Sequence, residues 1–407
     1  MSRVMLVCPE PLGHGQPAGI GIRFVEMANV LRADGHEVIV VSPDAGEVSG
    51  CAVAAISPET LRHASSSSDV MVVQGHVAND VFAYADRIPT VIDLYDPFII
   101  ENLHYFAERG LQVFAHDHAT LVNSLLKGDM FLCASEAQRL FYLGTLLALG
   151  RLNPVVFESD PNLDGLLRIA PFGVQRPRQS RTRNLGPAAI LFGGIYDWYD
   201  PILAIDAVAI ARMTIPGLTL TFTHHPNPEL TPQGKAAAAI AYTREKGYDF
   251  VEFVPWVAYE ARGEFFDGHA LSLLTFPQSL ETDLSMRTRV YDYLWGGVPI
   301  VTSSAPGTDE ILRRYGAGVV VQEDSAEAFA GAVVSILGDR PRYEAMLSGT
   351  RAFVEEHQWE RTLAPLVAFC RAPQRDASKE AFAARPDMPQ HIPSILERLK
   401  RRIGGRS

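Results

Sequence analysis

The chain has 407 residues and a formal net charge of −11 at pH 7, with 47% hydrophobic and 20% charged residues. This length exceeds what one hydrophobic core usually serves, so two domains are expected, and no apolar run is long enough for a membrane span. The negative charge argues against nucleic acid as the main partner, because binding its phosphates requires a basic face. Residues 1–8 lack the pattern of a signal peptide, so we expect a soluble, cytoplasmic protein.

Short β-branched segments alternate with helical patterns in the first half of the chain. This alternation predicts a mostly parallel sheet with helices on both faces, which is a doubly wound, Rossmann-like α/β unit. The predicted strands are 3–8, 37–42, 69–74, 89–93 and 130–133. The predicted helices are 19–33, 103–126 and 136–149. We assign residues 1–175 to this N-terminal domain.

The polar, proline-bearing segment 176–186 is typical of a linker, and the alternation restarts after it. A second Rossmann-like domain is therefore expected at 187–371. Its predicted strands are 188–192, 218–223, 250–253, 271–275 and 299–302. Its predicted helices are 201–213, 235–246, 288–295, 326–337, 342–357 and 359–369. The last of these helices are candidates to pack back on the first domain.

Residues 372–407 are rich in proline, alanine and charge, and we expect them to form a loosely attached basic tail. Within it, 392–403 has the pattern of a short basic amphipathic helix. Such a helix could touch an anionic membrane, but its single apolar stripe favours packing on this protein or on a partner.

Two arginines and an aspartate lie at the start of the predicted helix 288–295. Arg289 and Asp292 are three positions apart and therefore share a face. Open parallel sheets bind ligands beyond the carboxyl ends of their strands, so this helix should begin at a cleft between the two domains. There, Arg287 and Arg289 could hold a diphosphate as its charge grows, and Asp292 could accept hydrogen bonds from a ribose. The alternative is an ordinary surface ion pair.

The segment around this helix contains three short motifs. They are Glu281-Thr282, Arg287-Thr288-Arg289 and Asp292-Tyr293-Leu294-Trp295. Together they resemble a bacterial and archaeal branch of the family 4-like retaining glycosyltransferases of GT-B fold. The resemblance implies two domains facing a central cleft, the first binding an acceptor and the second a UDP- or GDP-linked sugar. It also implies metal-independent transfer with retention of anomeric configuration, to a small natural product or a surface-glycan precursor.

The same resemblance implies roles for Glu281 and Thr282. The broader family usually carries a glutamate eight positions before the ribose carboxylate, and Leu284 stands at that position here. Glu281 would then act near the donor sugar from a shifted loop, with Thr282 beside it in the donor site.

Other donor-binding candidates follow strand ends of the second domain. Gly193 and Gly194 end its first strand, where missing side chains would let backbone amides approach the donor phosphates, although a mere turn is the alternative. Four further residues complete the predicted donor site, with the core as the alternative place for a lone tryptophan. They are Asp197, Trp198, His225 and Trp256.

The first loop of the chain, 13–18, fits the glycine fingerprint of dinucleotide enzymes, and Asp44 ends the next strand, where a ribose-binding acid could sit. Pro17 falls where the helix should begin, so a dehydrogenase is disfavoured. Gly19 and Gly21 are instead expected to form a loop that meets the donor sugar.

Asp93 ends the fourth predicted strand and is a candidate to orient the acceptor nucleophile. Asp96, just before Pro97, suits the alternative role of a helix cap. The predicted catalytic residues are therefore Asp93, Glu281 and Arg289. Two other functions stay open: a nucleotide-sugar epimerase or hydrolase of the same fold, which needs no acceptor, and a catalytically inactive binding protein.

Neither cysteine nor histidine spacing indicates a metal site. The cysteines are far apart, without the paired spacing of a zinc ribbon or a redox dithiol, so we expect small buried side chains. They are Cys8, Cys51, Cys133 and Cys370. His116 and His118 bracket Asp117 in a helical pattern and would diverge, which makes a poor chelate. We predict no metal and no cofactor besides the nucleoside diphosphate sugar as co-substrate.

Overall fold

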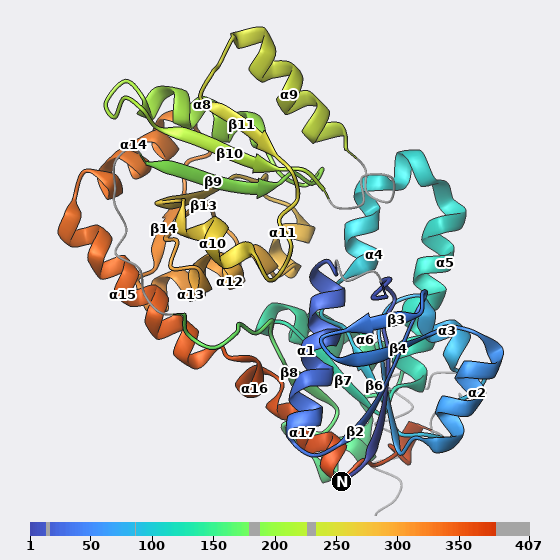
Figure 1. Ribbon diagram of the computed structural model, residues 1–407. Coiled ribbons are helices and arrows are strands. Elements are labelled where there is room, and N and C mark those ends of the chain that lie inside the picture. The colour runs from blue at the N-terminus through green and yellow to red at the C-terminus, as the bar shows by residue number, and fades with distance from the viewer. Residues whose placement is uncertain (14–16, 86, 179–187, 226–232, 380–407) are drawn as a thin grey trace, which may run out of the picture.

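The computed structural model describes residues 1–13, 17–85, 87–178, 188–225 and 233–379, and Figure 1 shows their arrangement. Two parallel-stranded sheets lie in separate halves of the molecule, the first built from strands β1–β8 and the second from β9–β14. None of the helices in these residues combines the length and apolar composition needed to cross a membrane.

The first sheet has eight strands in the order β3-β4-β2-β1-β5-β6-β7-β8, and all neighbours are parallel except β3 and β4. Its strands are β1 (Arg3–Val7), β2 (Glu37–Ser42), β3 (Gly46–Val48), β4 (Cys51–Ala55), β5 (Val70–Val73), β6 (Thr90–Asp93), β7 (Met130–Cys133) and β8 (Leu167–Ile169). Five of the eight were predicted, because strands buried on both faces form continuous apolar runs. Of the other three, β3 and β8 are the edge strands and β4 lies next to β3, and all three are only partly buried.

Helices cover both faces of this sheet. They are α1 (Gly19–Ala33), α2 (Pro58–Ser67), α3 (Val77–Val81), α4 (Phe98–Glu101), the 3-10 helix η1 (Asn102–Tyr105), α5 (Phe106–Lys127), α6 (Glu136–Ala148) and α7 (Pro154–Ser159). The prediction of one helix over 103–126 was wrong in detail. The chain there forms a 3-10 turn and then a helix that is kinked at Gly110, whose φ of 77° is not helical.

The second sheet has six parallel strands in the order β11-β10-β9-β12-β13-β14. They are β9 (Ala189–Gly194), β10 (Thr219–Thr223), β11 (Val251–Val254), β12 (Leu271–Leu274), β13 (Ile300–Ser303) and β14 (Gly318–Val321). The first five confirm the predicted strands to within two residues at each end. The edge strand β14 was not predicted, and all four of its residues are only partly buried.

The helices of the second half follow the predicted pattern with two differences: three helices are added, and the predicted helix 359–369 is divided at Leu363 into α16 and α17. They are α8 (Pro201–Ala211), α9 (Gly234–Lys246), α10 (Arg262–Asp267), α11 (Leu280–Leu284), α12 (Thr288–Trp295), α13 (Pro306–Tyr315), α14 (Ala326–Leu337), α15 (Arg340–Glu356), α16 (Trp359–Thr362) and α17 (Ala364–Arg371). Those not predicted are α10, α11 and α13.

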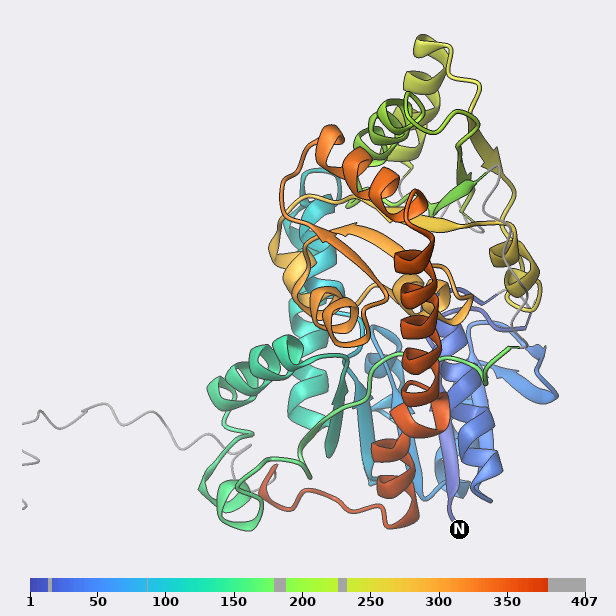
Figure 2. The same ribbon diagram turned by 90° about the vertical axis from the view of Figure 1, so that its left-hand side faces the viewer.

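The C-terminal helices return to the first half of the molecule. Figure 2 shows α15 running toward the first sheet, with α16 and α17 lying beside the N-terminus. Val174 forms an isolated parallel bridge with Gln358, and the Ser2 hydroxyl donates a hydrogen bond of 2.7 Å to the carbonyl of Cys370. These contacts hold the C-terminal helices against the first half of the molecule.

The start of the tail is firmly attached, which corrects the expectation of a loose segment from residue 372. Asp376 accepts a hydrogen bond of 2.8 Å from the guanidinium of Arg151, and its amide donates to Asp129. The Lys379 ammonium lies 2.6 Å from the same Asp129 carboxylate. The predicted amphipathic helix at 392–403 lies outside the described residues, as does most of the predicted linker.

Candidate functional site

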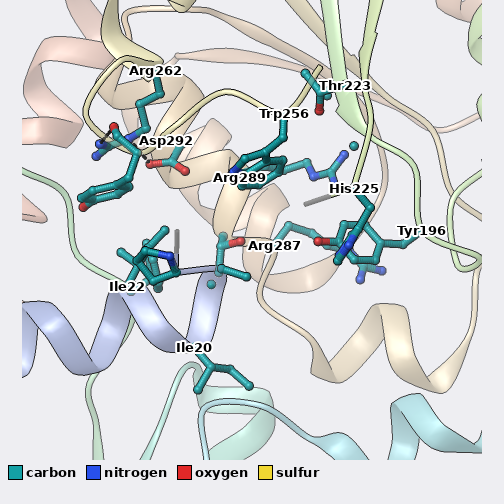
Figure 3. Close-up of a pocket in the computed structure, with 18 of the residues that line it drawn as sticks. Ile20, Ile22, Tyr196, Thr223, His225, Trp256, Arg262, Arg287, Arg289 and Asp292 are labelled. Carbon is teal, nitrogen blue, oxygen red and sulfur yellow. Dashed lines mark hydrogen bonds and ion pairs between the residues drawn. The ribbon is translucent and has the colours of Figure 1, made fainter. Parts of the chain in front are cut away.

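A cavity of about 950 Å³ lies between the two halves, at the carboxyl ends of their strands. The first half contributes the loop after β1, the start of α1 and the loop after β6, while the second contributes the loops after β9, β10, β11 and β12. Figure 3 shows Ile22 of α1 toward Arg262 and Asp292, with Ile20 below the start of the same helix. Its volume is at the upper end of the usual range for small-molecule sites, about 300–1,000 Å³.

Arg289 presents a positive charge beside the end of strand β9. Its Nη1 donates a hydrogen bond of 3.2 Å to the carbonyl of Phe192, and its guanidinium lies 4.2 Å from the centre of the Tyr199 ring. A side chain at Gly193 or Gly194 would come within 4 Å of this guanidinium. A cation and the backbone of two glycines therefore share one wall of the cavity, which is a suitable arrangement for an anion.

Gly193 is required by the backbone conformation and by the neighbouring Tyr293. Its φ is +85°, in the left-handed region, and an added Cβ would overlap the Tyr293 hydroxyl. That hydroxyl donates a hydrogen bond of 2.8 Å to the carbonyl of Phe192. Tyr293 of α12 thus packs directly against the end of β9, and no residue other than glycine fits at position 193 without rearrangement.

Gly193→Ala is expected to lower the free energy of unfolding by about 1–2 kcal/mol through the left-handed φ and by a further ~1–3 kcal/mol through overpacking against Tyr293. Tyr293→Phe removes the overlapping oxygen but also a hydrogen bond. Urea unfolding of the two single variants and the double variant should therefore show a double-variant loss smaller than the sum of the single losses. If the losses of unfolding free energy were strictly additive, the Tyr293 hydroxyl would not be what excludes a side chain at position 193.

Asp292 is oriented by an arginine from another loop. Arg262 Nε lies 3.1 Å from Asp292 Oδ1, and its guanidinium stacks on the rings of Tyr259 at 3.5 Å and Trp295 at 4.2 Å. The Asp292 side chain keeps 22% of its surface exposed. Burial raises the pKa of this carboxyl, whereas Arg262 and Arg289 oppose that shift. The carboxylate is held in one orientation at the cavity wall and can accept hydrogen bonds there.

Glu281 and Thr282 do not line the cavity, in contrast to their predicted placement. Glu281 is 1% exposed and forms a bidentate ion pair with Arg287, in which Nη2 and Oε2 are 2.6 Å apart. The Thr282 hydroxyl donates to the carbonyl of Pro277, and its amide donates to Ser279, the N-cap of α11. Both residues stabilise the segment before α12 from behind, because α11 turns their side chains into the protein.

Arg287 lines the cavity but is already engaged. Both of its terminal nitrogens are paired with Glu281, and within the described residues its Nε is buried without a hydrogen-bond partner. Its guanidinium carbon lies 5.0 Å from the Phe276 ring centre and 5.4 Å from that of Tyr199. Arg289, rather than Arg287, therefore has the guanidinium that is available to a ligand.

Aromatic side chains from the loops after β9, β10 and β11 form another part of the cavity lining. Tyr196 and Trp198 stack with ring centres 4.8 Å apart, and His225 meets Tyr196 edge-on at 5.2 Å. Trp256 also lines this region, as Figure 3 shows for Tyr196, His225 and Trp256. Asp197 does not, because its carboxylate turns away to accept a hydrogen bond of 2.9 Å from the amide of Lys235 at the start of α9.

Gly19 and Gly21 lie in the first turn of α1 and not in the predicted loop; Gly19 lines the cavity, whereas Gly21 does not. The amide of Gly21 donates a hydrogen bond of 2.9 Å to the carboxylate of Glu10, which itself faces the cavity. Burial raises the pKa of Glu10, and hydrogen bonds from the amides at the start of α1 only partly oppose this shift. Asp44 accepts hydrogen bonds from the amides of Leu12 and Gly13. Its carboxylate therefore stabilises the loop after β1, which is a different role from binding a ribose.

Asp93 lies beneath the cavity in a buried ion pair with Arg23 of α1. Nε to Oδ2 and Nη2 to Oδ1 are 2.7 and 3.0 Å apart, and both side chains are fully buried. Arg23 also donates to the carbonyls of Ala170 and Pro171. The predicted contact between Asp93 and an acceptor is therefore not seen, because α1 covers the end of β6 and supplies the partner.

Two carboxyl groups that the sequence did not single out for the site line the cavity instead. Asp96 follows β6 and is hydrogen-bonded to Glu101 of α4, and the Ser285 hydroxyl donates to Glu101 at 3.2 Å. Burial raises the pKa of Asp96 well above its usual range, and Glu101 adds to the shift; burial also raises the pKa of Glu101. One proton shared between them is the arrangement that this geometry favours.

The raised pKa of Asp96 predicts a pH-dependent stability. Because the folded-state pKa exceeds the unfolded one, protonated Asp96 contributes stability that is full below the unfolded pKa and is lost as pH rises through the folded pKa. Asp96→Asn carries no charge, although Glu101, Glu10 and Asp93 still surround it. Its melting temperature should fall less than that of the wild type between pH 4 and pH 9. If the melting temperatures of the two proteins fell equally with pH, the raised pKa of Asp96 would be contradicted.

Metal-binding side chains do not gather in the described residues: no group of three or more His, Cys, Asp or Glu could hold an ion there. Asp117 instead accepts hydrogen bonds from His76 at 2.6 Å and from Asn102 at 2.8 Å, and His116 stacks on His76. The four cysteines are buried and unpaired with one another, as predicted.

Comparison with known proteins gives a match to solved structures only. No protein-family model and no curated protein sequence matches the chain. The crystal structure of Anabaena HepE in complex with UDP and glucose matches with a TM-score of 0.65 and 14% identity, over 90% of this chain and 98% of HepE. HepE in complex with UDP-glucose gives 0.64 and 15% over the same shares.

Sucrose-phosphate synthase from Thermosynechococcus elongatus matches with a TM-score of 0.62 and 15% identity, over 94% of this chain and 100% of the synthase. At such identities the likeness shows the fold. The chain has the GT-B architecture, with two Rossmann-like α/β units facing a central cleft, and this confirms the predicted fold class.

Proposed function

We propose that this protein is a glycosyltransferase that moves a sugar from a nucleoside diphosphate sugar to an acceptor hydroxyl. The observation that carries the proposal is the Arg289 guanidinium beside Gly193 and Gly194, in a cavity formed by both halves of a GT-B fold. The structural neighbours support it, since HepE is seen with UDP and with UDP-glucose. UDP-glucose is therefore the first donor to test.

In this reaction the bond between the sugar C1 and the diphosphate oxygen breaks, and a bond between C1 and the acceptor oxygen forms. The acceptor hydroxyl loses its proton to the departing diphosphate, so charge and atoms balance. Arg289 and the amides of the Gly193–Gly194 junction stabilise the growing negative charge. We further propose that the acceptor attacks from the face that the diphosphate leaves, as in the family 4-like retaining enzymes, so that anomeric configuration is retained.

The remaining donor contacts follow from the same placement. Asp292, fixed by Arg262, accepts hydrogen bonds from the ribose hydroxyls. The aromatic group of Tyr196, Trp198 and Trp256 lies where it can flank the base. Residues 187–371 then form the donor domain, residues 1–175 the acceptor domain, and 176–186 their linker.

Chelation of divalent metals by EDTA is expected to leave the rate of UDP release unchanged, because Arg289 and backbone amides supply the positive charge that a metal ion would otherwise provide. The measurement is UDP release with and without EDTA. Recovery of a lost rate on adding Mg²⁺ or Mn²⁺ would contradict this part of the proposal.

Calorimetric titration with UDP and UDP-glucose, with GDP and GDP-mannose as comparisons, tests the donor site. Mass spectrometry of reactions containing candidate acceptors then tests transfer, and a product heavier by one hexose residue is expected. Consumption of UDP-glucose without such a product would favour an epimerase or hydrolase. Failure to bind every nucleotide would defeat both enzymatic functions.

A further inference from the structure

The two walls of the cavity carry opposite charges. The second half contributes Arg262, Arg287 and Arg289 together with one carboxylate, Asp292. Asp292 pairs with Arg262 and Glu281 pairs with Arg287, so among the described residues Arg289 is the arginine of this wall without a carboxylate partner. The first half contributes three carboxyl groups, and among the described residues it places no lysine, arginine or histidine in the lining. They are Glu10, Asp96 and Glu101. Among the described residues, the cationic side chains that could hold the anionic donor therefore lie in the second half.

The carboxyl groups are fixed in place by contacts from three different elements. Glu10 accepts the amide of Gly21 at the start of α1. Asp96 and Glu101 are hydrogen-bonded to each other, and Ser285 reaches across from the second half to donate to Glu101. The Tyr95 hydroxyl, from the same loop as Asp96, donates to the carbonyl of Met286 at 3.1 Å. Hydrogen bonds thus hold the carboxyl groups of this wall, and the wall adjoins the donor side of the cavity directly.

We infer that the acceptor is a neutral polyhydroxylated compound with no phosphate or carboxylate next to the attacking hydroxyl. Carboxylate oxygens accept hydrogen bonds from hydroxyl groups, whereas a second anion beside desolvated carboxyls is repelled. The inference rests on the proposed function and adds the substrate class of its acceptor side. Asp96, Glu101 and Glu10 are then the residues that determine acceptor specificity.

Matched acceptor pairs test this inference. The full-length protein is saturated with UDP-glucose and offered glucose or glucose 6-phosphate, glycerol or glycerol 3-phosphate, and inositol or inositol monophosphate, alongside a metabolite extract of the source cells. Products are identified by mass spectrometry and sorted by anion exchange. Within each reacting pair, the neutral member is expected to have a kcat/KM higher by about tenfold or more. Products from the extract should carry no anionic group beside the new linkage.

The double variant Asp96→Asn/Glu101→Gln keeps the size of both side chains and removes their charge. It is expected to reduce the preference for the neutral member by about tenfold. Asp80→Asn, on the exposed face of α3 and outside the cavity, should leave the preference unchanged. Circular dichroism and UDP binding establish that each variant is folded, and the wild-type preference tests the inference even if the double variant does not fold.

Two results would overturn the inference while sugar transfer still occurs: a wild-type preference for phosphorylated acceptors, or an anionic product from the extract. Loss of the neutral preference in Asp80→Asn would also count against it. Failure of the protein to bind UDP, or hydrolysis of UDP-glucose with no transfer to any acceptor, would instead defeat the proposed function, so the two failures are distinguishable.

Discussion

Arg289→Ala is expected to lower kcat/KM for sugar transfer by about 100- to 1,000-fold. This is the usual effect of removing one donor that stabilises a developing anion. Arg289 is the cation whose guanidinium faces the glycine junction after β9, and the neighbouring Arg287 cannot replace it because Glu281 holds both of its terminal nitrogens. Steady-state measurement of UDP release and calorimetric titration of UDP are the assays.

Two controls make this result specific. Arg313→Ala removes an exposed arginine near the end of α13 that does not line the cavity, and should leave kcat/KM unchanged. Arg289→Lys keeps the charge but loses the planar, bidentate group, so it should recover only part of the rate. Full activity of a folded Arg289→Ala would contradict the placement of the diphosphate.

Asp93→Ala is expected to lower the free energy of unfolding by about 3–5 kcal/mol, the usual cost of leaving one partner of a buried ion pair without the other. The Arg23 guanidinium has no access to solvent, and Asp93 is its only carboxylate among the described residues. Denaturant unfolding monitored by circular dichroism measures the change.

The matched control is Asp80→Ala, an exposed aspartate of α3 whose loss should change stability by no more than about 0.5 kcal/mol. Asp93→Asn should be intermediate, since an amide still accepts one hydrogen bond from Arg23. If Asp93→Ala retained its stability but lost transfer, Asp93 would instead be a residue that contacts the acceptor.

Local sequence patterns were sufficient to predict the main helices and strands that form the cavity. The predicted bounds of α1 and α12 agree with the structure because apolar periodicity and the glycines at helix ends are local signals. The position of Arg289 at the cavity also followed from sequence, since a helix that begins after a parallel strand faces the carboxyl edge of the sheet. The edge strands β3, β8 and β14 were missed because they are short and only partly buried.

Pairing between distant residues could not be predicted in this way. Arg262 is 30 residues from Asp292, and Asp93 is 70 residues from Arg23, so no spacing rule connects them. Glu281 was expected at the donor because of its motif, but the N-cap of α11 directs it toward Arg287. Strand-end position alone could have indicated Glu10 and Asp96, although not the hydrogen bond between Asp96 and Glu101.

The most direct test of the proposed donor site is a crystal structure of the protein with UDP bound. We predict that diphosphate oxygens lie within hydrogen-bond distance, about 2.7–3.2 Å, of Arg289 and of the amides at Gly193–Gly194, with a ribose hydroxyl on Asp292. UDP bound outside the cavity, or with its diphosphate away from Arg289, would contradict the account.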